Sequence, residues 1–209
     1  SRHAPGRIYF AANKVFRSDD YGNSWEVISE DLTRQMDRNK LKVYDRIVSI
    51  DAVAKNQSTS QYGTIVAMSE SPVNPELLAI GTDDGLIHIS EDGGSSWRKI
   101  DGIAGAPSRS YVNSVYLSKH DENLIYTAFN HHKYGDFKPY LLKSTDGGQT
   151  WSERLPTPKS WATSKEVPTI YRVIDPKAGK KRLIMFSGLY PIRMAVSEDD
   201  GLSWSPLNP

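Results

Sequence analysis

The sequence contains no cysteine, so disulfide bonds and cysteine-ligated metal sites are excluded. No apolar run reaches the ~18–20 residues that a membrane-spanning helix needs. An excess of one charge is also lacking, since 26 Lys and Arg residues face 25 Asp and Glu residues in a chain of 209. The resulting net charge of +1 gives no electrostatic footprint for nucleic acid or for an anionic membrane.

Two further features are missing. No segment shows the 3.6-residue apolar period of a long amphipathic helix, which argues against an α-helical fold. The chain opens with SRHAPGRIYF, which lacks Met and already has the pattern of a strand, so we do not expect a signal peptide within this sequence. This start is typical of a cut through a longer protein. Aromatic residues at 10% and charged residues at 24% nevertheless indicate an ordered globular chain.

The sequence does contain a repeat, S-x-D-x-G-x-[ST]-W, which occurs four times without a gap. Successive copies are separated by close to the ~40–50 residues of a four-stranded propeller blade, except that the first interval is about twenty residues longer. Only Trp161 lies outside the motif among the five tryptophans. The copies comprise Ser18, Asp20, Gly22 and Trp25; Ser90, Asp92, Gly94 and Trp97; Ser144, Asp146, Gly148 and Trp151; and Ser197, Asp199, Gly201 and Trp204.

Short β-rich runs with turn signals between them surround each motif and predict an all-β fold. We expect a β-propeller of four-stranded antiparallel blades, with about four blades present as a partial propeller. Residues 1–209 then form one domain, in which the first blade lacks its innermost strand. The blades are expected at 7–29, 64–100, 111–155 and 167–207, with an inserted connection at 30–62.

The motif always lies between the third and fourth strands of a repeat, which makes it a hairpin turn. Asp and Ser side chains hydrogen-bond nearby backbone groups, Gly supplies a positive φ, and Trp buries its ring between adjacent sheets. These roles favour a structural over a catalytic function for the motif aspartates. The acidic pairs Asp83-Asp84 and Asp199-Asp200 also fall in hairpin turns, and their position gives no support for glycoside hydrolysis.

The four motifs resemble the Asp-box, or BNR repeat, of sialidase-type and sortilin-type β-propellers. Residues 7–155 are similar to large bacterial sortilin-like BNR proteins of the glycosyl hydrolase type, whereas 165–207 resemble a blade of an exo-sialidase-like protein. The resemblance implies a propeller fold and an extracellular, periplasmic or cell-envelope location. It does not imply one activity, because such propellers include sialidases, xyloglucan hydrolases, sorting receptors and binding modules.

The sialidase pattern is incomplete. Sialidases carry an Arg-Ile-Pro triplet whose Arg helps to bind the substrate carboxylate, and the matching place here reads Glu166-Val167-Pro168. Arg193 remains a candidate for contact with an acidic sugar, and Arg172 follows on the first strand of that blade. No Tyr-Glu nucleophile pair can be placed. Sialidase activity is therefore not expected.

Binding residues of a propeller are expected on the loops of the face opposite the motif turns. Besides the connection 30–62, the candidates lie in NHHKYGDFKPY, SGLYPIR and TPKSWATSKE. Two adjacent histidines fall short of the three or four ligands of a zinc site, so we expect no metal and no cofactor. Trp161 is either a stacking platform or a plug between blades, and Tyr190 either stacks on a sugar or covers a blade edge. The ligand-contact candidates are His131, His132, Tyr134, Asp136, Trp161, Tyr190 and Arg193.

These observations favour a non-catalytic binding module for a glycan or a polypeptide. The alternative is part of a glycoside hydrolase, sialidase-like or xyloglucanase-like, whose catalytic residues lie largely outside this chain. A third possibility is a scaffold without a site of its own. The expected partners are the remaining blades of a longer protein, or a second copy that pairs through the open blade edge.

Overall fold

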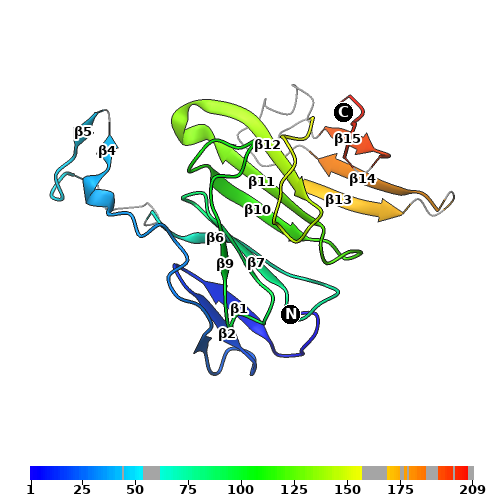
Figure 1. Ribbon diagram of the computed structural model, residues 1–209, viewed down its shortest axis with the longest axis horizontal. Helices are drawn as coiled ribbons and strands as arrows, with labels where there is room; N and C mark the ends of the chain where they lie inside the picture. The colour runs from blue at the N-terminus through cyan, green and yellow to red at the C-terminus, as the bar shows by residue number, and fades with distance from the viewer. Residues whose placement is uncertain are drawn as a thin grey trace.

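The computed structural model describes residues 1–43, 45–53, 62–156, 169–174, 177, 179–186, 193–199 and 201–206. This part of the chain forms four antiparallel β-sheets, in sequence order, and one small hairpin. Figure 1 shows the first sheet in blue, the next two in green, the fourth in orange and red, and the hairpin standing apart from them. No helix in the described residues is long and apolar enough to cross a membrane.

The first three sheets follow from short runs rich in Val, Ile, Tyr and Phe, which favour extended backbone. The first contains β1 (Ile8–Ala11), β2 (Val15–Ser18) and β3 (Glu26–Val27). The second contains β6 (Ile65–Glu70), β7 (Leu78–Thr82), β8 (Ile87–Ser90) and β9 (Arg98–Ile100). The third contains β10 (Tyr111–Leu117), β11 (Ile125–His131) and β12 (Asp136–Ser144).

The fourth sheet contains β13 (Thr169–Ile174), β14 (Lys181–Phe186) and β15 (Met194–Ser197). In every sheet each strand pairs with the next strand along the chain. β1 is an edge strand of the first sheet. The predicted antiparallel all-β array is confirmed.

The structure differs from the sequence expectation at the outer edges of the third and fourth sheets, where no fourth strand forms in the described residues. The outer segment of the third sheet still donates from the Ser152 N–H to the Lys143 carbonyl at 2.8 Å. In return, the Lys143 N–H donates to the Ser152 hydroxyl at 3.0 Å rather than to a backbone carbonyl. Ser205 makes the same exchange with Val196. At each edge a serine hydroxyl thus takes the place of one backbone acceptor.

The long connection contains the 3-10 turn η1 (Arg38–Lys40) and the hairpin of β4 (Lys42–Val43) and β5 (Arg46–Ile47). Arg34 fastens its beginning to the second sheet, because the Arg34 N–H and Nε donate to the Asp84 carboxylate and carbonyl at 2.9 and 2.8 Å. The Arg34 guanidinium also pairs with Asp101. Only the start of the predicted insertion is therefore pinned to a blade by these contacts.

Each Asp-box turn begins at the serine that ends a strand, which is β2, β8, β12 or β15 in the four sheets. In the second sheet, the Ser90 hydroxyl donates to Asp92 Oδ1 and accepts from the Gly94 N–H, both at 2.8 Å. Asp92 Oδ1 also accepts from the Ser96 N–H at 2.8 Å. The other three turns repeat these bonds within 0.1 Å. One serine and one aspartate therefore supply the same set of local bonds in all four turns.

The core lies between neighbouring sheets. Leu78 and Ile80 on β7 pack against Ile28 of the first sheet, whereas Ala79 on the same strand packs toward the third sheet. This division follows from the two-residue period of a strand. Trp97 belongs to the first interface and Trp151 to the second, so each of these rings reaches toward the preceding sheet.

One face of the first sheet is exposed, although the equivalent face of the second sheet is buried. Phe10 pairs with Phe16 in β1 and β2, in the register that pairs Ile80 with His88 in β7 and β8. Ile80 has 0% exposure, but Phe10 is 59% exposed and Trp25, which contacts it edge-on, is 46% exposed. No described residue covers this face as the first sheet covers the second.

Candidate functional site

The loops at the far end of each strand from the Asp-box turns meet in one place. They are the β7–β8 hairpin, the segment that enters β6, the β9–β10 connection and the 3-10 turn η2 (His132–Tyr134) between β11 and β12. Their side chains form a surface that we call the aromatic loop surface. It consists of Tyr62, Arg109, Tyr111, His131, Lys133 and Tyr134.

His131 and Tyr134 form the centre of this surface. Their rings stack with centroids 4.3 Å apart and an interplanar angle of 15°. The Ser110 hydroxyl lies 3.0 Å from His131 Nδ1 and fixes the ring from the β9–β10 side. Gly135 ends η2 with φ +74°, a conformation that glycine adopts without strain, and this tight turn returns the chain into β12. The stack is thus anchored at both sides.

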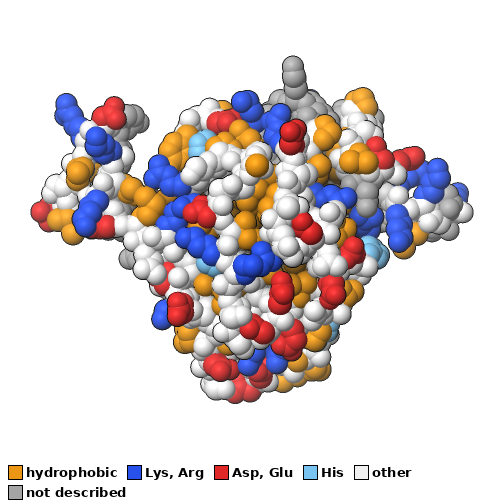
Figure 2. Space-filling view, in the orientation of Figure 1, with side chains coloured by type: hydrophobic (Ala, Val, Ile, Leu, Met, Phe, Trp, Pro, Cys, Tyr) orange, Lys and Arg blue, Asp and Glu red, His pale blue; other side chains and the backbone are white. Residues whose placement is uncertain are grey.

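Two cations contact the rings of this surface. Lys133 Nζ lies 5.3 Å from the centroid of the Tyr62 ring and 5.8 Å from that of Tyr111, and Arg109 lies 5.9 Å from the Tyr134 ring. These distances are within the ~6 Å range of cation–π attraction. Burial raises the pKa of Tyr62 to about 12, so its phenol stays protonated. Figure 2 shows hydrophobic and basic side chains side by side over this end of β11 and β12, around a histidine.

Arg109 is held in an unusual backbone conformation. Its φ is +58°, in the left-handed region that side-chain-bearing residues rarely occupy. Gly85 of the β7–β8 hairpin lies against it, since an ideal Cβ on Gly85 would come within 2.7 Å of the Arg109 Cα. Such strain persists where the surrounding structure enforces it, and it is concentrated at functional sites. The hairpin therefore sets the direction from which Arg109 reaches Tyr134.

Asp83 and Asp84 lie beneath this surface and are buried. Asp83 Oδ1 accepts from the Gly63 and Thr64 N–H groups at 2.9 and 2.8 Å. Asp84 accepts from the Thr82 hydroxyl at 2.5 Å and from the Arg34 N–H. Burial raises the pKa of Asp83, and the two N–H bonds act in the opposite direction. Both carboxylates therefore bind the protein's own loops together.

The structure brings His131 and Tyr134 together but separates the other candidates of the same loop. His132 packs against Phe137 instead. Asp136 Oδ2 accepts from the Tyr140 hydroxyl at 2.5 Å, which lowers the pKa of Asp136. Burial, with this bond, raises the pKa of Tyr140 to about 12. Asp136 thus serves a local contact at the start of β12.

Of the remaining candidates, only Arg193 lies in the part of the chain that the structure describes, and it is not part of the aromatic loop surface. Arg193 is exposed beside β15 in the fourth sheet. Trp161 and Tyr190 lie outside the described residues. No group of three His, Asp or Glu residues in the described part of the chain is placed to hold a metal ion.

Sequence reasoning missed Tyr62, Arg109, Tyr111 and Lys133. Tyr62 ends the long insertion and Tyr111 begins β10, so both lie where a connection enters a strand. Their position at the start of a strand is the sequence signal that could have identified these two tyrosines, because the ends of successive strands converge on one face of a propeller.

A family model for the BNR/Asp-box repeat matches residues 142–153, which hold the third motif. A comparison with curated protein sequences gives no significant match. Among solved structures, an ancestral GH74 enzyme matches 98% of the chain at 16% identity with a TM-score of 0.58. The GH74 xyloglucanase from Xanthomonas campestris matches 98% at 18% identity with a TM-score of 0.55. The GH74 enzyme of Niastella koreensis matches 98% at 16% identity with a TM-score of 0.52.

These likenesses define the fold. The chain is a β-propeller protein, and its repeat is the BNR/Asp-box repeat, as the sequence predicted. It spans 22% of the length of the ancestral enzyme and 28% of each of the other two. At these identities the match establishes architecture and leaves activity to the site itself.

Proposed function

We propose that this chain is a non-catalytic Asp-box propeller module that binds a glycan or a polypeptide segment through the aromatic loop surface. The observation that carries the proposal is the His131–Tyr134 stack with Lys133 and Arg109 beside it. Flat rings offer an apolar contact for a sugar face or an aromatic side chain, and cations attract a carboxylate or sulfate. A ligand with a ring and a negative charge suits this surface.

The state of the nearby carboxylates supports binding over hydrolysis. A glycoside hydrolase needs two carboxyl groups that reach a bound sugar from opposite sides. Asp83 and Asp84 are buried in contacts with loop backbone, and Asp136 is bonded to Tyr140. None of these three offers a free carboxylate pair to a ligand on the aromatic loop surface.

The experiment is a binding titration with two probes, a sulfated oligosaccharide and an acidic peptide. Tyr134→Ala and Lys133→Ala should each lower the affinity for the tighter-binding probe by about tenfold or more, since aromatic and cationic anchors dominate such contacts. The matched control is Tyr116→Ala, an exposed tyrosine near the other end of β10. Equal loss in the control, or no binding of either probe, would refute the proposal. Hydrolysis of a glycan by the chain would replace it with the enzyme alternative.

We further propose that the exposed face of the first sheet pairs with another Asp-box blade, from a longer protein or from a second copy. The face holds Phe10, Phe16, Trp25 and Val27. The fourth sheet carries a second apolar set at the other end of the array, where Tyr171 and Phe186 contact each other edge-on. Both sets have the composition of a blade-to-blade interface. A location outside the cytoplasm fits the family resemblance and belongs to the same proposal.

A further inference from the structure

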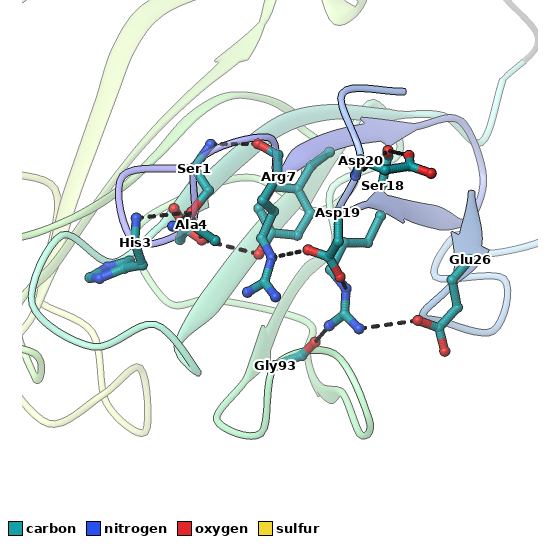
Figure 3. Close-up of polar contacts among 12 residues, drawn as sticks. Ser1, His3, Ala4, Arg7, Ser18, Asp19, Asp20, Glu26 and Gly93 are labelled. Atoms are coloured by element: carbon teal, nitrogen blue, oxygen red, sulfur yellow. Dashed lines mark hydrogen bonds and ion pairs between the residues drawn. The ribbon is translucent and has the colours of Figure 1, made fainter. Parts of the chain in front are cut away.

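A groove of about 650 Å³ lies between the outer part of the first sheet and the Asp-box turn of the second. Its size is that of a small-molecule site. One wall is the segment from Glu26 to Leu32, and the other is the turn from Gly93 to Trp97. Arg17 spans the end between the walls, donating to Glu26 at 3.1 Å and to the Gly93 carbonyl at 3.4 Å (Figure 3). The groove lies at the opposite end of β8 from the aromatic loop surface.

His88 forms part of the lining and is the least expected residue there. It is only 5% exposed, and neither ring nitrogen makes a hydrogen bond of good geometry to a described residue, although the Leu32 carbonyl lies near the ring. The position two residues before the Asp-box serine is apolar in the other three repeats, where it holds Phe16, Leu142 and Ala195. Packing alone therefore calls for an apolar side chain. A buried polar group without a partner is costly, and its presence points to a role other than packing.

The ring is a neutral imidazole at physiological pH. Burial lowers the pKa of His88 to about 4, and the Leu32 carbonyl near the ring opposes this only in part. A neutral imidazole has one donor nitrogen and one acceptor nitrogen. A hydroxyl group can both donate and accept a hydrogen bond, so it can bond to either nitrogen. Both nitrogens are buried. A sugar hydroxyl would therefore reach a ring nitrogen only after the ring rotates about χ2, whose energy minimum is broad.

The rest of the lining adds acceptors and negative charge. The carboxylate of Glu30 is exposed and makes no ion pair or hydrogen bond with the described residues. The only cation in the lining, Arg17, is already paired with Asp19 and Glu26, while Glu26, Glu30 and Asp31 contribute three carboxylates. Figure 2 shows acidic side chains gathered over the first sheet. This environment repels anions and offers acceptors to hydroxyl groups.

We propose that this groove binds a small neutral sugar, with His88 and Glu30 hydrogen-bonding its hydroxyl groups and Trp97 lining its apolar side. The ligand class differs from that of the aromatic loop surface, which favours a negatively charged ligand. The two sites are at opposite ends of the second sheet, and the groove does not depend on the loop surface binding anything.

The test is an NMR titration that follows the histidine rings and tryptophan indoles of the unmodified chain. Galactose and cellobiose are the neutral probes, and N-acetylneuraminic acid is the acidic one. We expect the neutral probes to shift the His88 ring and Trp97 indole signals, and the acidic probe to shift neither. His88→Leu, which copies the third repeat, should keep the fold and weaken neutral-sugar binding by about tenfold. Glu30→Gln should weaken it by a smaller factor, and Glu153→Gln, an exposed control, should have no effect.

The proposal is overturned if no neutral probe shifts His88, or if His88→Leu binds as tightly as the unmodified chain. It is also overturned if the acidic sugar binds in the groove equally well. Lys133→Ala separates the two sites. Loss of the acidic ligand at the loop surface with unchanged sugar binding in the groove supports two sites, whereas joint loss contradicts the assignment of the groove.

Discussion

The indole N–H of Trp97 donates to the carbonyl oxygen of Ile28 at 2.9 Å. This bond joins the Asp-box turn of the second sheet to the outer edge of the first. The same N–H lies 3.1 Å from the carbonyl of Gly94 within its own turn. The motif tryptophan therefore closes its own loop and attaches it to the preceding sheet.

Replacement of Trp97 by Phe should lower the free energy of unfolding by about 1–3 kcal/mol, because the Ile28 carbonyl loses its donor in a partly buried interface. Trp25→Phe is the matched control, since the Trp25 N–H reaches only the Gly22 carbonyl and its ring is largely exposed. Urea unfolding of the two variants measures the difference. Equal losses would show that the bond between sheets contributes nothing.

The Asp-box aspartates should make the chain sensitive to strong acid. Hydrogen bonds from Ser24, Thr150 and Ser203 lower the pKa values of Asp20, Asp146 and Asp199 from 3.8 to about 2. A carboxyl whose pKa falls on folding stabilises the fold above its unfolded pKa, and this contribution is lost as the pH drops through the folded value. Stability should therefore decline between pH ~4 and ~2.

Asp146→Asn measures this contribution in one turn. The variant should be less stable than the unmodified chain at pH 7 and should lose less stability on acidification. The control is Asp121→Asn, because Asp121 is an exposed turn residue outside the motif. Parallel pH profiles for Asp146→Asn and the unmodified chain would contradict the prediction.

The four sheets could be predicted because their determinants are local. Each motif fixes its own turn through Ser and Asp bonds that span four residues, so its position in the sequence gives the end of one strand and the start of the next. The outer segments after Trp151 and Trp204 could not be predicted as readily. Whether Ser152 or a backbone carbonyl accepts the Lys143 N–H depends on the position of the whole sheet edge.

The location of the candidate site could be predicted from the sequence, but the full set of residues that form it could not. The loop NHHKYGDFKPY gave His131 and Tyr134, because ring-bearing residues clustered in one connection. Lys133 acquires its role only from Tyr62, which precedes β6 of the second sheet, and from Tyr111, which begins β10 of its own sheet. Contacts between residues that far apart in sequence arise from the packing of sheets, which no local pattern encodes.

The exposed apolar face should drive association of the isolated chain. Burying large apolar side chains between blades is favourable by ~25 cal/mol per Å² of apolar surface removed from water. Phe10→Glu should therefore shift the chain toward the monomer in light scattering, and Tyr171→Glu should do so if the fourth sheet is the partner. Tyr116→Glu is the control at an exposed site away from both faces. If the unsubstituted chain is a monomer at all concentrations, self-association is contradicted, and the proposed partner of this face is a blade of a longer protein.

His88 should produce a second pH dependence, at milder acidity than the aspartates. Its pKa falls from 6.5 to about 4 on folding, chiefly through burial. The unfolded chain therefore takes up the proton first as the pH drops, and stability declines between pH ~6.5 and ~4, by up to ~3 kcal/mol. His88→Leu should abolish this slope and leave the acid transition of the aspartates in place. An unchanged slope in that variant would assign it to other groups.

Gly81 should be required for the close approach of the second and third sheets. An ideal Cβ at Gly81 would come within 2.7 Å of Val112 Cβ and 3.2 Å of Val115 Cγ2. Gly81→Ala should destabilise the chain by about 1–3 kcal/mol, since added volume in a packed core forces neighbours to shift. Val112→Ala removes the Cγ methyl groups at the same point and keeps the Cβ, so it relieves part of the overlap. The double variant Gly81→Ala/Val112→Ala should therefore be more stable than the sum of the two single losses predicts. Strict additivity in urea unfolding would show that the two residues do not share the contact.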